Sequence, residues 1–183
     1  PDHGLVDLAF DGATVTVADA YGGWHALDPT AALTTAVGYL HVASVAYGVA
    51  WADGWALVAA GPDGLRIVDA RHLADPHLLG ALDLDDLAPR GRTLAATERR
   101  LYVPAAAPER PGIGVVDVSD PASPRRMGTV PVAARHIAPL GDRYLVADDE
   151  AARYAGLRIV DVTDPAHAVD VATLPLSATV SAL

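Results

Sequence analysis

The sequence contains no cysteine and no lysine among its 183 residues, and glutamate is nearly absent. Without cysteine, a disulfide framework, a thiolate metal site and a cysteine nucleophile are all excluded. All thirteen basic residues are arginine, and twenty of the 23 acidic residues are aspartate. Helix surfaces favour Glu and Lys, whereas Asp belongs in turns. These absences therefore disfavour a helical protein.

Regular helix signals are missing as well, since no stretch sustains a helical period with caps. Fourteen prolines and sixteen glycines interrupt the chain, which is typical of a turn-rich β protein. Hydrophobic residues nevertheless make up 51% of the sequence and charged residues only 20%. That balance excludes an intrinsically disordered chain and is sufficient for a sizeable core.

The formal net charge of −10 disfavours nucleic acid as a partner, because an acidic chain repels phosphates. No basic-then-apolar leader is visible, so no signal peptide is expected within this sequence. Residues 31–52 carry no charge and are long enough to cross a bilayer. Their threonine, serine and glycine content favours two strands and a turn instead, so no membrane span is predicted.

A repeat of forty-odd residues runs through the chain. The segments 64–69 and 156–161 are the identical hexapeptide Gly-Leu-Arg-Ile-Val-Asp, 112–117 is a close copy, and 23–28 is a degenerate one. The copies end at aspartates that are 41, 48 and 44 residues apart: Asp28, Asp69, Asp117 and Asp161. An Asp-Pro pair follows the last three copies and coincides with the end of the first.

Each repeat unit is predicted to contain four short strands, A to D, because short β-branched and apolar runs are bounded by Gly, Asp and Pro. Four antiparallel strands at this period are the signature of β-propeller blades. The predicted fold class is all-β, with about four blades as a fragment or a partial or small propeller. The approximate blades are 5–43, 44–88, 89–132 and 133–175, and 176–183 begins a further A strand. The C strands are expected near 24–28, 64–70, 112–118 and 156–162.

The strand register predicts which repeat positions face the core. Ile67, Val115 and Ile159 occupy equivalent places in their copies and are expected to be buried on one blade face, with Ala26 as the degenerate equivalent. Arg66 and Arg158 should alternate onto the opposite face, because successive side chains of a strand point to opposite sides.

The motif Gly-Leu-Arg-Ile-Val-Asp-Val-Ser/Thr-Asp-Pro resembles the LVIVD-repeat propellers of bacterial and archaeal surface and secreted proteins. The likeness is close at 156–165, good at 64–69 and 112–121, and weak in the first unit. It implies an extracellular or cell-surface location. It also implies seven blades for a full ring, which needs about 300 residues at this repeat length. Four units therefore predict an open or small ring, and an open ring would expose blade faces and favour self-association.

A candidate ligand site is predicted at the rim where the A strands begin, beside the variable B–C connections. Binding residues gather on loops that a rigid scaffold holds. The residues expected to surround the channel mouth are Asp7, Tyr47, Arg92, Arg135 and His136. Paired arginines from adjacent blades would suit a carboxylate, a sugar or an acidic peptide. His136 with Asp7 would alternatively provide an acid–base pair.

The remaining polar features favour structural roles. The aspartates that end the four C strands are expected to accept hydrogen bonds from the following turn. Asp148, Asp149 and Glu150 form the only acidic cluster with calcium-site chemistry, but their spacing favours a solvated loop. The scattered histidines lack zinc-site spacing, and no nucleotide-binding or hydrolase motif occurs. No metal site and no cofactor are therefore predicted.

The sequence thus predicts a non-enzymatic propeller segment that binds a protein, an acidic small molecule or a glycan as part of a surface or secreted protein. One alternative is a hydrolase or lyase that acts on carbohydrate at the channel mouth, and His136 within hydrogen-bond reach of a carboxylate would favour it. The other alternative is a structural spacer with no ligand, because fold does not imply function.

Overall fold

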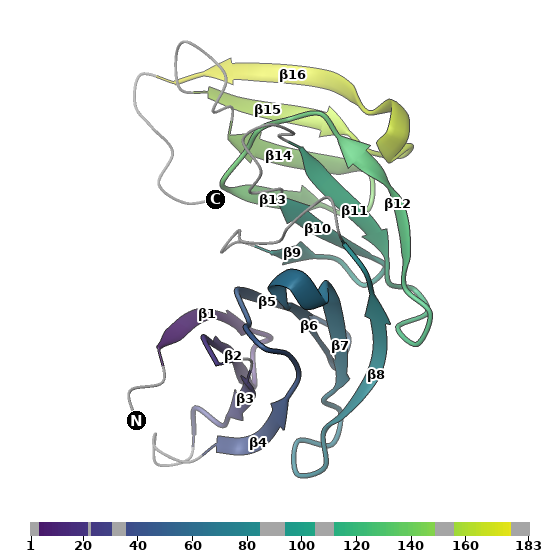
Figure 1. Cartoon of the computed structure of the whole chain (residues 1–183). Coiled ribbons are helices and arrows are strands. Elements are labelled where there is room, and N and C mark those ends of the chain that lie inside the picture. Colours follow the sequence, from purple (N-terminus) through teal and green to yellow (C-terminus); the bar gives the residue numbers. More distant parts are fainter. Residues whose placement is uncertain are drawn as a thin grey trace.

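The computed structural model describes residues 4–21, 23–30, 36–84, 94–104, 112–148 and 156–176. These residues form four sheets, each of four antiparallel strands in sequential order. The sheets follow one another along an arc, with the first sheet at one end and the fourth at the other (Figure 1). The predicted all-β fold of four propeller blades is confirmed.

Each blade consists of four consecutive strands. The first blade holds β1 (Leu5–Phe10), β2 (Val15–Asp19), β3 (Gly23–Leu27) and β4 (Ala36–His41). The second holds β5 (Gly48–Ala52), β6 (Trp55–Ala59), β7 (Leu65–Asp69) and β8 (His77–Leu82). The third holds β9 (Ala95–Ala96), β10 (Arg100–Pro104), β11 (Ile113–Asp117) and β12 (Arg125–Val130). The fourth holds β13 (Ile137–Leu140), β14 (Tyr144–Asp148), β15 (Gly156–Asp161) and β16 (Val169–Pro175).

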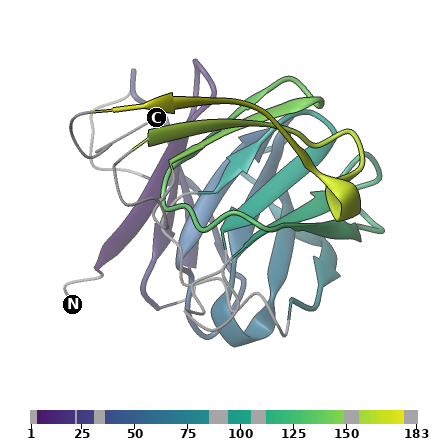
Figure 2. The same cartoon turned by 90° about the horizontal axis from the view of Figure 1, so that it is seen from above.

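The first strands of successive blades lie side by side along the inner side of the arc, and the last strands lie along its outer side (Figures 1 and 2). Two single-turn 3₁₀ helices, η1 (Gly61–Asp63) and η2 (Pro165–His167), lie in connections between strands. The third strands β3, β7, β11 and β15 fall where the repeat motif predicted them. No helix within the described ranges is long and apolar enough to cross a membrane.

The core lies between the blades, because each sheet is packed on both sides wherever it has two neighbours. We call the side of a blade that faces the preceding blade its leading face, and the other side its trailing face. The trailing face of the second blade, with Leu57 and Ile67, packs against the leading face of the third, with Leu101 and Val116. Equivalent clusters join the first blade to the second and the third to the fourth.

The predicted core register is confirmed at Ile67, Val115 and Ala26, which are all fully buried. The prediction of a buried Ile159 is wrong, since this side chain is only partly buried. Ile159 pairs with Val146 on the trailing face of the fourth blade, and no described blade covers that face. Arg66 pairs with Val58 and so lies on the face opposite to Ile67, as predicted.

The aspartates at the ends of the third strands fix the turns that follow, as the sequence predicts. Each carboxylate accepts a hydrogen bond from the backbone N–H two residues later. The donors are Thr30 at 2.8 Å from Asp28, Arg71 at 3.1 Å from Asp69, Ser119 at 2.9 Å from Asp117 and Thr163 at 2.9 Å from Asp161. Because this bond recurs in every blade, the motif aspartate has a structural role.

Glycines in the outer strands allow neighbouring blades to approach closely. Gly38 and Gly80 stand opposite Ala26 and Ile67, and a Cβ at either glycine would overlap the carbonyl oxygen of a turn in the next blade. Gly128 has the same role in the third blade, where a Cβ would lie 2.8 Å from the backbone nitrogen of Ala166. The turn after each third strand therefore docks on the glycine of the blade before it.

Candidate functional site

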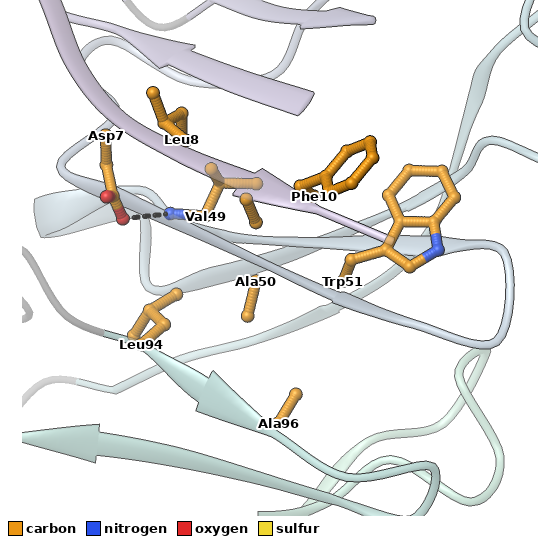
Figure 3. Close-up of a pocket in the computed structure, with 9 residues that line it drawn as sticks. Asp7, Leu8, Phe10, Val49, Ala50, Trp51, Leu94 and Ala96 are labelled. Carbon is orange, nitrogen blue, oxygen red and sulfur yellow. Dashed lines mark hydrogen bonds between the residues drawn. The ribbon is translucent and has the colours of Figure 1, made fainter. Parts of the chain in front are cut away.

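A pocket of about 280 Å³ opens on the inner wall of the arc, across three neighbouring blades. Its lining comes from β1, β5, β9 and the residue before β9 (Figure 3). The lining residues are Asp7, Leu8, Ala9, Phe10, Val49, Ala50, Trp51, Leu94 and Ala96. All but one of these side chains are apolar, so the pocket combines an apolar wall with a single carboxylate.

Asp7 supplies the only charge of the pocket and is partly buried in β1. Its Oδ2 accepts a hydrogen bond of 3.0 Å from the backbone N–H of Val49, in the next blade. Burial raises the pKa of Asp7, while the bonds from the backbone of Val49 and Leu8 oppose that shift. The carboxylate is therefore ionised at neutral pH at a cost in free energy, since a charge loses hydration when it is buried.

Two aromatic side chains lie at the opposite end of the pocket from Asp7 (Figure 3). Phe10 is 58% exposed, and Trp51 is partly exposed. Exposed aromatic rings offer a large apolar contact area to a ligand. The pocket thus has one end that accepts hydrogen bonds and one end that suits an apolar group.

The described rim residues of the sequence-predicted site are held by partners within their own blades. Tyr47 donates its backbone N–H to the carbonyl of Ala59 over 2.8 Å. The backbone N–H groups of Arg135 and His136 donate to Oδ1 of Asp148, over 2.7 and 3.0 Å. Arg92 lies outside the described residues. The proposed convergence of these residues on one ligand stays a prediction.

His136 lies beside a carboxylate, but not the one that the sequence suggested. Its Nδ1 is 2.9 Å from Oδ2 of Asp148, whereas Asp7 bonds to Val49. The sequence analysis missed this role of Asp148 and treated the residue as part of a solvated acidic loop. Asp148 is the last residue of β14, and its backbone pairs with the start of β13. That pairing is the signal that places the carboxylate beside His136.

A second pair of the same kind occurs in the first blade, between Asp19 and His25. Oδ1 of Asp19 accepts the backbone N–H groups of Tyr21 and Gly23, and its Oδ2 is 2.6 Å from Nε2 of His25. These bonds lower the pKa of Asp19 although burial opposes them. In both pairs the carboxylate holds two backbone amides and one histidine, which is the arrangement of a loop clamp.

Two further hollows lie near the opposite rim. One of about 530 Å³ is lined by the turn residues Gly12 to Thr14, by Asp28 to Thr30, and by Val37 and Leu73. The other, of about 150 Å³, is lined by Arg99, Arg100, Asp117, Met127 and Asp142. Within the part of the chain that the structure describes, no group of three or more acidic or histidine side chains could hold a metal ion.

Comparison with known proteins places the repeat. A family model described as "LVIVD repeat" matches residues 107–132 and 134–173. No curated protein matches the chain. Among solved structures, the crystal structure of BamB from Moraxella catarrhalis is similar with a TM-score of 0.65 and 14% identity, over 96% of this chain and 49% of that chain.

This likeness shows the fold alone, since the two sequences differ at most positions. This chain spans about half the length of BamB, which is a β-propeller. The family match falls on the third and fourth blades, where the motif is most regular. The four described sheets, their sequential order and the two repeat matches lead to one assignment: the chain is an LVIVD-repeat β-propeller protein.

Proposed function

We propose that the chain is a non-enzymatic binding module that holds its ligand against the inner wall of the arc. The observation that supports this function is Asp7, a partly buried carboxylate in an otherwise apolar pocket. A charge buried at a cost in stability is typical of a site kept for function. The aromatic end of the pocket would add contact area for the same ligand.

The pocket suits a segment that carries a basic hydrogen-bond donor next to an apolar group. An ammonium or guanidinium group would pair with Asp7, and the apolar group would lie on Phe10 and Trp51. The net charge of −10 favours the approach of such a basic ligand at low salt. An exposed segment of another protein that holds arginine or lysine beside a large apolar residue has this chemistry.

Binding of short synthetic peptides to the purified chain tests the proposal. Peptides with Arg-Trp or Lys-Leu pairs should bind more tightly than the same peptides with Glu in place of the basic residue. Asp7→Asn should weaken binding about 10- to 100-fold, the usual loss for a hydrogen bond to a charged group. Trp51→Ala should also weaken it.

Asp75→Asn is the matched control, because Asp75 is an exposed carboxylate in a turn away from the pocket. This control removes the same charge and should leave peptide affinity unchanged. Equal affinity for the basic and the acidic peptides, or equal losses in Asp7→Asn and Asp75→Asn, would contradict the proposal.

The location of the protein remains part of the proposal. The resemblance to surface and secreted LVIVD proteins supports an extracellular or cell-surface role, and an inner wall that faces solvent would be accessible to partners there. Fractionation of cells that express the full-length gene product, followed by surface protease treatment, tests this location. Protection of the protein from added protease in intact cells would contradict it.

Carbohydrate hydrolysis or elimination is the second candidate function, and the pair His136–Asp148 is the observation in its favour. An Asp that holds the Nδ1 side of a histidine can leave Nε2 to act as an acid or base. The two backbone amides on the same carboxylate favour the clamp role instead. Turnover of a glycan that His136→Gln abolishes, with unchanged folding, would support the enzyme.

A further inference from the structure

The two end faces of the arc carry the residues that are buried between blades elsewhere. On the leading face of the first blade, Leu8 and Phe10 are 56% and 58% exposed. Leu8 corresponds in register to Val49 of the second blade, which is 2% exposed. The two positions differ in their neighbours rather than in their chemistry, because a described blade precedes only Val49.

The trailing face of the fourth blade shows the same contrast. Val146 and Ile159 pair there and are partly exposed, whereas the equivalent pair Leu57 and Ile67 is fully buried in the second blade. Other residues extend the apolar surface on this face: Ala138, Leu140, Leu157 and Leu174. Apolar surface of this extent marks an interaction site.

We propose that the two end faces pack against a second copy of this chain, so that two arcs close one ring of eight blades. In that ring the trailing face of the fourth blade of each copy meets the leading face of the first blade of the other. The chain spans 49% of a related propeller chain, so one arc corresponds to about half a ring. Eight blades lie within the usual range for propellers, although the family resemblance implied seven.

Ala172 indicates which kind of blade can follow the fourth. It stands opposite Ile159, in the place that Gly38, Gly80 and Gly128 occupy in the other blades. A regular Asp-Val-Ser/Thr-Asp-Pro turn docks so closely on that glycine that a Cβ would meet its backbone. Another regular repeat therefore does not fit against β16 at the usual distance.

The first blade departs from the regular motif at that same turn. Its motif aspartate, Asp28, is followed at once by Pro29, whereas Asp117 and Asp161 are followed by the full turn. The irregular blade thus matches the irregular outer strand. This complementarity favours the first blade of a second copy as the occupant over a further regular repeat.

The contact is heterologous, because two different faces of the molecule meet. Such contacts form a closed ring when the rotation between copies closes, and an open filament when it does not. A half-ring arc related to its partner by a two-fold axis closes at two copies, and both end faces are then covered. The inner wall with Asp7 would line the channel of that ring.

Light scattering coupled to size-exclusion chromatography measures the assembly of the full chain. We expect a mass of twice 18.9 kDa that does not grow further with concentration. Leu8→Arg or Ile159→Arg alone should reduce it to the monomer, since each removes one partner of both contacts. Leu78→Arg is the control, because Leu78 is 49% exposed on β8 of an interior blade. It should stay dimeric, and circular dichroism should show the folded state of all three.

Cross-linking tests the order of the blades across the contact without disrupting folding. The chain has no cysteine, so introduced thiols react only with each other. A mixture of Leu8→Cys and Ala138→Cys chains should form a disulfide-linked heterodimer on mild oxidation, because their equivalents Val49 and Ala9 line one pocket across an interior contact. Either variant alone should not cross-link.

A chain that stays monomeric at all concentrations would overturn the proposal, and would leave the end faces to further blades of a longer chain. Open-ended growth with concentration would overturn the closed ring. Self-cross-linking of Leu8→Cys alone would overturn the head-to-tail order. None of these results depends on a ligand at Asp7, so they are independent of the binding function.

Discussion

Ile67 and Ile159 occupy the same position of two identical hexapeptides, yet Ile67 is fully buried and Ile159 is only partly buried. Ile67 contacts the third blade through the cluster of Leu57, Leu101 and Val116. Ile159 lies on the end face of the arc. The difference arises from the neighbours, since the local sequence and register are the same.

The first prediction compares these two residues in a matched pair of variants. Ile67→Ala should lower the free energy of unfolding by about 2–5 kcal/mol, the usual cost of a cavity in a packed core. Ile159→Ala should cost clearly less within one chain, because its side chain already touches solvent. Urea unfolding at low protein concentration, where dimers dissociate, gives both values. Equal losses would show that the end face is covered within the chain.

The second prediction concerns acid stability. The hydroxyl and backbone N–H of Thr163, with Arg143, hold the pKa of Asp161 at about 2, below its ordinary 3.8. A lowered pKa stabilises the fold above the ordinary value, and that contribution is lost as the pH falls from about 4 to 2. Asp161→Asn should therefore be less stable than the natural chain at pH 7, with the gap closing by pH 2.

Urea midpoints at pH 7, 4 and 2 measure this gap, and Asp75→Asn is the control. Asp75 lies exposed in a turn, and its replacement should not produce a gap that closes in acid. A constant gap for Asp161→Asn across all three pH values would contradict the role of the carboxylate in the turn.

The third prediction concerns the cost of Asp7. Burial raises its pKa, so the native state binds the proton more tightly than the unfolded state. The ionised form then destabilises the fold above its ordinary pKa, and this penalty disappears as the pH falls. Asp7→Asn should be at least as stable as the natural chain at pH 7, because an amide oxygen can still accept from Val49. A marked loss of thermal stability at pH 7 would assign Asp7 a structural role.

The fourth prediction tests the loop clamp at the rim. Asp148→Ala leaves the backbone N–H groups of Arg135 and His136 without their acceptor. We expect a loss of about 1–3 kcal/mol in unfolding free energy, the cost of an unsatisfied buried group. His136→Gln should cost less, because the two amide bonds remain. A larger loss for His136→Gln would show that the histidine contributes more than the amides do.

The fifth prediction keeps the acidic-ligand hypothesis open to experiment. If Arg92 and Arg135 bind one anion, Arg135→Ala should weaken that anion by about 2–5 kcal/mol, the usual effect at a buried charge pair. Binding should also weaken as salt rises. A screen of carboxylated and sulfated sugars by calorimetry measures this effect. Equal anion affinity for Arg135→Ala and the natural chain would eliminate the hypothesis.

Local sequence signals predicted the strands and turns of this fold well. The Gly…Asp copies located β3, β7, β11 and β15, because the motif encodes both a strand and the turn after it. The role of the terminal aspartates followed from the same local chemistry, since each bonds to a backbone N–H only two residues away. Such contacts need no knowledge of the rest of the chain.

Features that depend on distant contacts were not predictable in the same way. Burial of Ile159 depends on whether another blade follows, which the hexapeptide does not encode. The pair Asp148–His136 depends on β13 and β14 lying side by side, and the charge in the pocket depends on Asp7 reaching the next blade. These features follow from the stacking of blades, whereas the motif specifies only the blade itself.

The central claim is that the four blades form an open arc whose end faces do not meet within one chain. Spin labels at Leu8→Cys and Ile159→Cys of the cysteine-free chain, diluted with excess unlabelled protein, report the distance between the two faces of a single molecule. The account predicts a separation well beyond the about 10 Å between packed sheets. A separation near that spacing would contradict it, because the first and fourth blades would then close a four-blade ring.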